Sequence, residues 1–495
     1  MKIRRMTIIP LLAALMASSL SGCNEWLEVK PDNEQSNAVF WANKEEVFGV
    51  VTGAYQQMRS ALATLVQWGE VRSDEIELGP GWSSNTEMLE VRSLEIKPDN
   101  AICNWQPLYN CIGRCNSVME YAPQVLEKDN TFAPETEAAY IAEVKWLRAL
   151  CYFYLVRTFG DVPYVLRAWL YDDMPFEVPV TSGEEVLEAE IASLTEVLDD
   201  FPVSYGAGSW MDKGRATIWS AYALLADMYL WLGKYDDCIT MCSKLEASHL
   251  FSLVENKEWY SIYYPGNSVE GIFELQWSEK YEQTNNLYAW FFNDSASNNY
   301  AISESAKQKF LEYPTEDDVR AAGGSYVDAS SKIWKYAGTS RGGSSTRESS
   351  KRDANWIVYR FADILLMHAE ALIMKGSEYY DEAYTYIVQI RERAGYLTHP
   401  VMPADESAAL DFLLDERLRE LCFEGKRWYD LVRIAVRDDG KYKSKLVYLL
   451  LLNVPAKDRP LYEIKLQDIH GYYLPIQEND IDASGGVLVQ NPYYL

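Results

Sequence analysis

The sequence predicts a mainly α-helical protein, with a scaffold of stacked helix pairs, long irregular loops and a few short strands. Two observations lead to this prediction. Several long segments repeat apolar residues at helical spacing and place small residues where two helices must approach closely. Other segments are rich in Gly, Asn, Ser and aromatic residues and have no helical period. Because 48% of the residues are hydrophobic, the chain can bury a large core.

The chain begins with the layout of a bacterial lipoprotein signal peptide, residues 1–22. Three basic residues precede an apolar stretch that is too short to span a bilayer comfortably. The stretch ends in Leu20-Ser21-Gly22-Cys23, which has the pattern of a lipobox. We therefore expect acylation (palmitate or a similar fatty acid) at Cys23 and attachment of the mature chain, residues 23–495, to a membrane through lipid. The alternative is an ordinary secreted protein whose cysteine falls there by chance.

The clearest helical unit spans residues 215–246. Its small and aromatic residues fall near the positions that a tetratricopeptide helix pair requires, and Gly233 lies at the predicted turn. A similar unit spans residues 360–395, a more degenerate one spans 138–159, and residues 105–125 are the candidate start of a fourth. Units of this kind stack into a solenoid whose core no single unit completes. Since these units are far apart in the sequence, we expect large loops to interrupt the stack.

The irregular segments lie mainly within residues 66–100 and 250–355. Short strands are expected at 271–277 and 333–336, and residues 337–353 have the composition of a mobile Gly- and Ser-rich loop. Binding residues often lie on loops that a rigid frame positions. We therefore expect the ligand site of this single-domain chain in these segments.

The charge and the cysteine pattern argue against several classes of function. A formal net charge of −27 repels nucleic acid and anionic lipid headgroups. The seven cysteines other than Cys23 are predicted to be free and buried. Two pairs of them are four residues apart on helices, where Cβ atoms are ~5–6 Å apart, while a disulfide requires ~3.5–4.5 Å. The four histidines are scattered through the sequence, so we expect neither a metal site nor a cofactor.

Motifs distributed over the mature chain occur in a characteristic order. They are Trp26-Leu27-Glu28-Val29-Lys30-Pro31, Ala142-Glu143-Val144-Lys145-Trp146-Leu147-Arg148-Ala149, Phe159-Gly160-Asp161-Val162-Pro163, Gly214-Arg215-Ala216-Thr217, Tyr359-Arg360-Phe361-Ala362-Asp363, Asp415-Glu416-Arg417-Leu418-Arg419-Glu420-Leu421, Phe423-Glu424-Gly425-Lys426-Arg427-Trp428, Tyr473-Leu474-Pro475-Ile476-Gln477 and Gln490-Asn491-Pro492. In these motifs and their order the chain resembles the SusD/RagB family of outer-membrane nutrient-binding lipoproteins. The resemblance implies a tetratricopeptide-like scaffold with an irregular ligand-binding region.

The resemblance also implies a function at the cell surface. Members of the family lie as lids over a SusC-like TonB-dependent transporter. We expect this chain to capture a glycan, an oligo- or polysaccharide, and to deliver it to such a partner in the outer membrane. One alternative keeps the fold but changes the cargo to peptides, as in RagB-like uptake components. A second is a surface glycosidase, which requires two carboxyl groups ~5–9.5 Å apart that flank the scissile bond.

The conspicuous charged residues of the motifs have a structural interpretation instead. Arg417, Glu420, Glu424 and Arg427 are three or four residues apart and can form a ladder of paired charges along a helix. They lie in amphipathic helices rather than on cleft loops. We therefore do not expect this protein to be an enzyme.

Trp82 is the first candidate ligand-binding residue. A flat aromatic face can stack on the C–H face of a sugar ring, while amides and carboxylates bind the hydroxyls. The turn-rich sequence Gly79-Pro80-Gly81 gives the Trp82 indole few neighbours in the sequence. The resemblance implies a platform aromatic in this loop, preceded by an acidic residue that Asp74 resembles. A helix-capping role is the alternative for Asp74.

Tyr288 and Trp290 are the next candidates, because they alternate with amides within residues 283–293, which have no regular period. Trp277 lies at the end of a predicted strand, where the alternation also allows a core position. Tyr264 lies in a loop, directly before a Pro-Gly pair. Together with Trp82 and Asp74, these residues make up the predicted ligand site.

Overall fold

The computed structural model describes residues 40–168, 178–206, 208–295, 297–313, 317–348 and 352–495. The predicted signal peptide and Cys23 lie outside this part of the chain. Among the described helices, none is both long and apolar enough to cross a membrane. The other seven cysteines are free and buried, as predicted.

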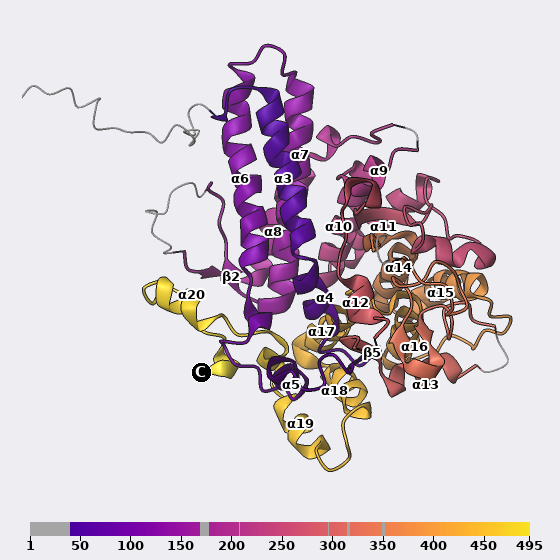
Figure 1. The fold of residues 1–495 in the computed structure, drawn as a ribbon. Helices are drawn as coiled ribbons and strands as arrows, with labels where there is room; N and C mark the ends of the chain where they lie inside the picture. Colours follow the sequence, from indigo (N-terminus) through magenta and orange to yellow (C-terminus); the bar gives the residue numbers. More distant parts are fainter. Residues whose placement is uncertain (1–39, 169–177, 207, 296, 314–316, 349–351) are drawn as a thin grey trace, which may run out of the picture.

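Three long helices of the N-terminal part lie side by side as a bundle (Figure 1). They are α3 (Lys44–Ser60), α6 (Gln106–Leu126) and α7 (Pro134–Phe159), and α8 (Gly183–Glu196) packs against α7. Helix α3 begins with a capping box, in which the side chains of Asn43 and Glu46 accept from each other's backbone N–H groups. The predicted units at 105–125 and 138–159 are the two halves of one helix pair, not parts of different pairs.

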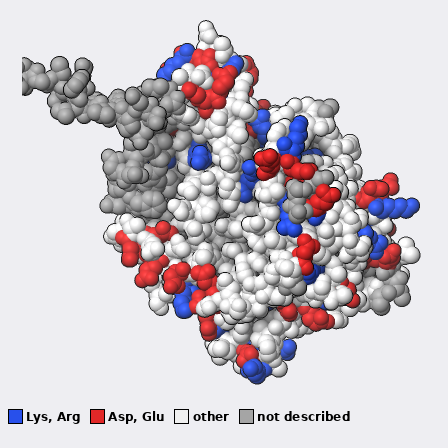
Figure 2. All heavy atoms as spheres, viewed as in Figure 1, with Lys and Arg blue, Asp and Glu red and all other residues white. Residues whose placement is uncertain are grey.

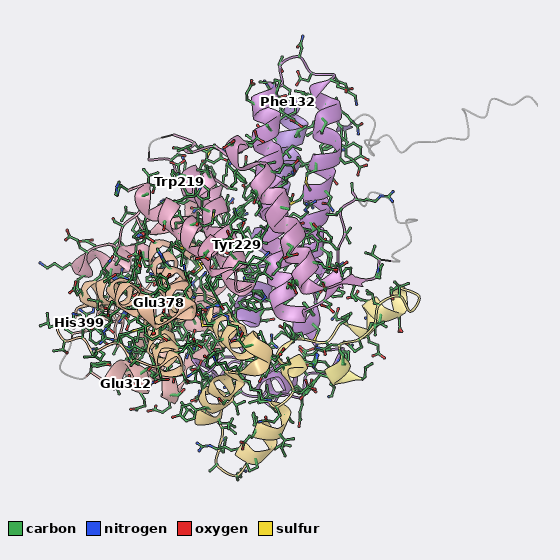
Figure 3. The ribbon with its side chains drawn as sticks, turned by 180° about the vertical axis from the view of Figure 1, so that it is seen from behind. Phe132, Trp219, Tyr229, Glu312, Glu378 and His399 are labelled. Carbon is green, nitrogen blue, oxygen red and sulfur yellow. The ribbon has the colours of Figure 1, made fainter. Side chains whose placement is uncertain are left out.

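Two further helix pairs stack beyond the bundle. They are α10 (Ile218–Trp231) with α11 (Tyr235–Ala247), and α14 (Phe361–Lys375) with α15 (Tyr380–Ala394). Gly233 adopts a left-handed conformation (φ 72°) at the turn between α10 and α11, where the sequence predicts a turn. Helix α11 packs directly on α14, so the long segment between them is looped out of the stack. Seen from behind, Phe132 marks the tip of the bundle, Tyr229 lies on α10, and Glu378 precedes α15 (Figure 3).

The C-terminal helices complete the scaffold. They are α16 (Glu406–Leu421), α17 (Arg427–Gly440), α18 (Lys443–Leu452), α19 (Arg459–Lys465) and α20 (Glu478–Ala483). Helix α14 packs on α16. Helix α17 packs on α18 and on α4 (Leu62–Glu70) from the N-terminal part. Segments far apart in the sequence therefore share one core.

Short antiparallel strand pairs hold the irregular segments. The pairs are β1 (Ile76–Leu78) with β5 (Tyr300–Ile302), β2 (Val162–Pro163) with β3 (Val180–Thr181), β4 (Gly271–Leu275) with β8 (Trp356–Arg360), and β6 (Tyr326–Val327) with β7 (Lys332–Ile333). The strands predicted at 271–277 and 333–336 correspond to β4 and β7, which are both shorter. The same segments contain the short helices α5 (Thr86–Arg92), α9 (Met211–Gly214), α12 (Leu287–Phe291) and α13 (Glu304–Leu311).

The core of the scaffold contains buried ion pairs between different elements. Glu420 of α16 accepts hydrogen bonds from Arg360 (2.6 Å), Arg320 (3.0 Å) and Arg393, and all four residues are buried. Burial opposes the charge of Glu420, but Arg393, Arg360 and Arg320 hold its pKa below the ordinary value. The predicted charge ladder along a single helix is therefore wrong. Because α16 packs against α13, α14, α15 and α17, its charged residues find their partners on other elements.

Candidate functional site

The loop that carries Trp82 is held by backbone hydrogen bonds to the segment before β5. Gly79 N–H donates to the carbonyl of Asn299 (2.7 Å), and Gly81 N–H donates to that of Asn298 (2.9 Å). A Cβ at either glycine would lie 2.3 Å from a backbone oxygen of residues 297–298. Only glycine allows so close an approach. The two glycines thus bring Trp82 next to β5.

Trp82 itself is half-buried. Its ring meets Tyr300 edge to face, with the ring centroids 4.9 Å apart. The backbone N–H of Trp82 donates to the carbonyl of Gly79 (3.0 Å), which closes a tight turn. The contact with Tyr300 orients the indole, and part of its surface stays open to solvent.

Helix α12 carries Tyr288 and Trp290, which have different environments. Tyr288 is buried, its hydroxyl donates to Asp294 (2.6 Å), and the guanidinium of Arg352 lies 4.2 Å from its ring centroid. Burial raises the pKa of Tyr288 to about 12, so the hydroxyl stays protonated. The prediction that Tyr288 stacks on a ligand is corrected, because its ring is already packed. Trp290 is half-buried, and its carbonyl accepts from Asn299 N–H (2.8 Å).

Trp277 and Tyr264 lie on the loops at either end of β4. Trp277 is half-buried. Its backbone N–H donates to Asn355 Oδ1 (3.1 Å), and the Arg59 guanidinium lies 5.7 Å from its ring centroid. Tyr264 is 38% exposed, and the guanidinium of Arg347 lies 4.9 Å from its ring. Each ring is therefore supported on one side by a cation and is partly open to solvent.

Asp74 does not belong to the site. Its carboxylate is buried, and both oxygens accept from the guanidinium of Arg427, at 2.7 and 2.8 Å. Its carbonyl accepts from Ser303 Oγ (2.6 Å) and Asn453 Nδ2 (2.7 Å). The predicted ligand-binding role is corrected, as is the alternative of a helix cap. Asp74 instead joins the start of the Trp82 loop to α17.

Hydrogen bonds connect the segments that carry the remaining candidates. Asn285, just before α12, donates its backbone N–H to Arg352 O (2.9 Å) and its side-chain amide to Ala354 O (2.7 Å). Asn355 contacts Trp277, and Asn299 links Trp290 to the Trp82 loop. We call Trp82, Trp290, Trp277 and Tyr264 the aromatic surface. Helix α12 and β5 lie on the face of the molecule seen in Figure 1, which has broad uncharged areas (Figure 2).

Two arginines of this region were not predicted to contribute. Residues 337–353 have a mobile loop's composition, yet Arg347 packs on Tyr264, and Arg352 packs on Tyr288. Arg347 also pairs with Asp353 (3.0 Å). The available signal was the three arginines, Arg341, Arg347 and Arg352, scattered through a Gly- and Ser-rich segment, since arginine stacks on aromatic faces.

A buried carboxyl pair lies near the Trp82 loop. Glu70 and Glu75 are both 0% exposed and share a hydrogen bond. Glu75 also accepts from the backbone N–H of Phe423 (2.7 Å), and Glu70 from that of Gly425. Burial raises the pKa of Glu75 to about 7 and also raises that of Glu70 well above its ordinary value. Because both side chains are fully buried, the pair fits a structural role better than glycoside hydrolysis, in which two carboxyl groups flank a bound sugar.

Two cavities in the described part of the chain lie away from the aromatic surface. One of about 640 Å³ is lined by the end of α7, by Trp231 and by the C-terminal segment around Tyr473 and Asn491. The other, of about 380 Å³, lies between α13, α16 and α18. Neither of these two cavities is lined by a residue of the aromatic surface.

Two family models match consecutive parts of the sequence. The first, described as "Starch-binding associating with outer membrane", matches residues 25–230. The second, described as the SusD family, matches residues 258–494. The chain belongs to the SusD/RagB family. Each motif that suggested this family lies within one of the two matched regions.

Individual relatives within the SusD/RagB family extend over the same length. The chain is 27% identical to SusD-like protein P38 of Formosa agariphila, over 86% of this chain and 90% of that protein. It is 25% identical to SusD-like protein P2 of the same organism, over 100% of both chains. Among solved structures, a "Laminarin binding SusD-like protein" matches with a TM-score of 0.69 and 21% identity, covering 91% of this chain and 99% of that one. Surface glycan-binding protein A from Bacteroides thetaiotaomicron matches with a TM-score of 0.70 and 21% identity, covering 92% and 100%. These similarities confirm the predicted fold class.

Proposed function

We propose that this SusD/RagB-family protein binds a glycan at the aromatic surface and delivers it to a SusC-like TonB-dependent transporter in the outer membrane. The observation that carries the proposal is a set of partly exposed aromatic rings on loops and on α12, of which Trp82, Trp277 and Tyr264 are each oriented by a side-chain contact. A ring that is already oriented loses little conformational entropy when a sugar stacks on it. Stacking contacts are individually modest, so several rings on one surface suit a chain of sugar units.

The comparisons support a carbohydrate as the ligand. One matching family model is described as starch-binding, and two structural relatives are named for laminarin and glycan binding. The same family description supports a location at the outer membrane. We propose that lipid on Cys23 supplies the attachment, with the protein displayed at the cell surface. The role proposed is binding and delivery without catalysis.

Isothermal titration against starch, laminarin, xylan, mannan and agarose, in parallel with a peptide library, tests the ligand class. We expect saturable binding of at least one polysaccharide. Binding of peptides alone would replace this proposal with a RagB-like peptide-uptake role. Reducing ends released over hours by the purified protein would indicate a glycosidase. For delivery, we expect a TonB-dependent transporter to co-purify with the tagged protein from outer-membrane extracts.

A further inference from the structure

An exposed tryptophan lies at the start of α9, outside the aromatic surface. Trp210 is 56% exposed, although a tryptophan side chain has one of the largest apolar areas available for burial. It follows Gly206 and Gly208, as Trp82 follows Gly79 and Gly81. The two loops therefore share a local sequence pattern that presents an indole to solvent.

The indole of Trp210 is held by the protein on one side. A Cβ added to Gly214 would lie 3.0 Å from Cζ3 of Trp210 and 2.6 Å from Cγ of Gln276. The six-membered ring therefore lies against the backbone of Gly214, beside the aliphatic part of Gln276. Helix α9 in turn packs against β4. Trp210 is thus oriented, and more than half of its surface remains available to a ligand.

A pair of hydrogen-bonded side-chain amides lies next to this ring, with the half-buried Gln276 beside it and Asn267 exposed. Gln276 and Asn267 bind each other reciprocally: Asn267 Nδ2 donates to Gln276 Oε1 (3.0 Å), and Gln276 Nε2 donates to Asn267 Oδ1 (2.8 Å). Each side-chain amide has two N–H donors and two acceptor lone pairs. The exposed Asn267 therefore keeps one donor and one acceptor, on opposite sides of its amide, and each can bind a sugar hydroxyl.

Gln276 also connects this amide pair to the aromatic surface. It directly precedes Trp277, and its carbonyl accepts from the Arg59 guanidinium (3.1 Å) that lies over the Trp277 ring. Asn355, which holds Trp277, donates to Gln276 Oε1 (3.0 Å). The amides therefore lie between Trp210 and the loop of Trp277.

We propose that Trp210, Asn267 and Gln276 form a second sugar subsite that adjoins Trp277 and takes further units of the same glycan chain. The inference rests on the proposed function of the aromatic surface. The recognising groups are the Trp210 indole and the Asn267 amide, which suit neutral sugar units, while Gln276, whose own amide is fully hydrogen-bonded, positions them. When two subsites bind one chain, the second contact is made at high effective concentration, so affinity rises with chain length.

The test measures affinity against chain length. Fragments of two to ten units are prepared from the polysaccharide of the five-member panel that binds most tightly, and each is titrated into wild type and Trp210→Ala. We expect Trp210→Ala to weaken binding of the longest fragments by about three- to tenfold and to leave the shortest unchanged. Trp82→Ala should weaken binding at every length.

A second variant and a control keep the result interpretable. Asn267→Gly removes the amide but suits the left-handed backbone at this position (φ 54°), and it should weaken only the long fragments. Tyr448→Ala, which removes an aromatic ring that is 64% exposed on α18, should change nothing. Equal affinities of Trp210→Ala and wild type at all lengths, or an equal loss at all lengths, would overturn the second subsite alone. If no panel polysaccharide binds the wild type, both proposals fail.

Discussion

Asp74 and Arg427 form a two-pronged ion pair, with both contacts below 3 Å, between residues 353 positions apart in the sequence. Both side chains are buried. The pair fastens the beginning of the Trp82 loop to α17 of the C-terminal scaffold. The position of the Trp82 loop therefore depends on a buried ion pair formed by a residue at its beginning.

Asp74→Asn should destabilise the fold. Removing one partner of a buried ion pair leaves an uncompensated charge and costs about 3–5 kcal/mol. We expect that loss in the free energy of unfolding, measured by urea denaturation, while the exposed Asp328→Asn stays near wild type. A variant that keeps its stability but loses glycan affinity would return Asp74 to the ligand site.

Trp82→Ala should weaken binding of the panel polysaccharide by about tenfold, or ~1.4 kcal/mol. Because the ring is half-buried, we expect the melting temperature to fall by only a few degrees. Trp82→Phe keeps an aromatic face and should restore most of the affinity. If Trp82→Ala unfolds the protein at room temperature, a core role for Trp82 is correct instead. The same pair of measurements applies to Trp290→Ala.

The Glu70–Glu75 pair should make the fold less stable as the pH rises. Burial raises the pKa of Glu75 to about 7 and also raises that of Glu70, so the folded protein retains protons that the unfolded chain releases above about pH 4.5. Their stabilising contribution is complete below that pH and declines as the pH rises through 7. Glu70→Gln imitates the protonated acid. Between pH 5 and 8, the free energy of unfolding of this variant should fall by about 1–3 kcal/mol less than that of the wild type. Glu87→Gln, at an exposed position, should keep the wild-type pH profile, and an unchanged profile in Glu70→Gln would refute the shared proton.

Glu370 should give the opposite pH dependence. Burial opposes its charge, yet Arg433 and Arg437 lower its pKa to about 2. Its contribution to stability is therefore complete above about pH 4.5 and is lost as the pH falls toward 2. Glu370→Gln should lower the free energy of unfolding at pH 7 by about 3–5 kcal/mol and should reduce its pH dependence between 5 and 2. The exposed Glu382→Gln serves as the control, and a steep acid dependence that persists in Glu370→Gln would contradict the assignment.

Cys23→Ala should abolish lipid attachment. In cells fed radiolabelled palmitate, we expect the label on the wild-type protein and on Cys103→Ala, since Cys103 is buried, but not on Cys23→Ala. Label retained by Cys23→Ala would refute the lipobox assignment.

Features that depend on neighbouring residues could be predicted well. The helix pairs 215–246 and 360–395 follow from apolar spacing and small residues, and the turn at Gly233 from a single glycine. The free state of the two cysteine pairs that are four residues apart follows from a helical spacing that disfavours disulfide geometry. Trp82 and Trp290 are both partly open to solvent, but Trp290, which the sequence places in an irregular segment, lies on the short helix α12.

Features that depend on distant partners could not be predicted. Asp74 and Tyr288 have the sequence surroundings of ligand-binding residues, but Arg427 and Arg352 occupy them. Trp210 is next to Gln276 only because α9 packs on β4. Local periodicity and turn chemistry act over a few residues and are therefore readable along the chain. Which side chains end up buried, paired or free is settled by contacts that form only when remote segments pack together.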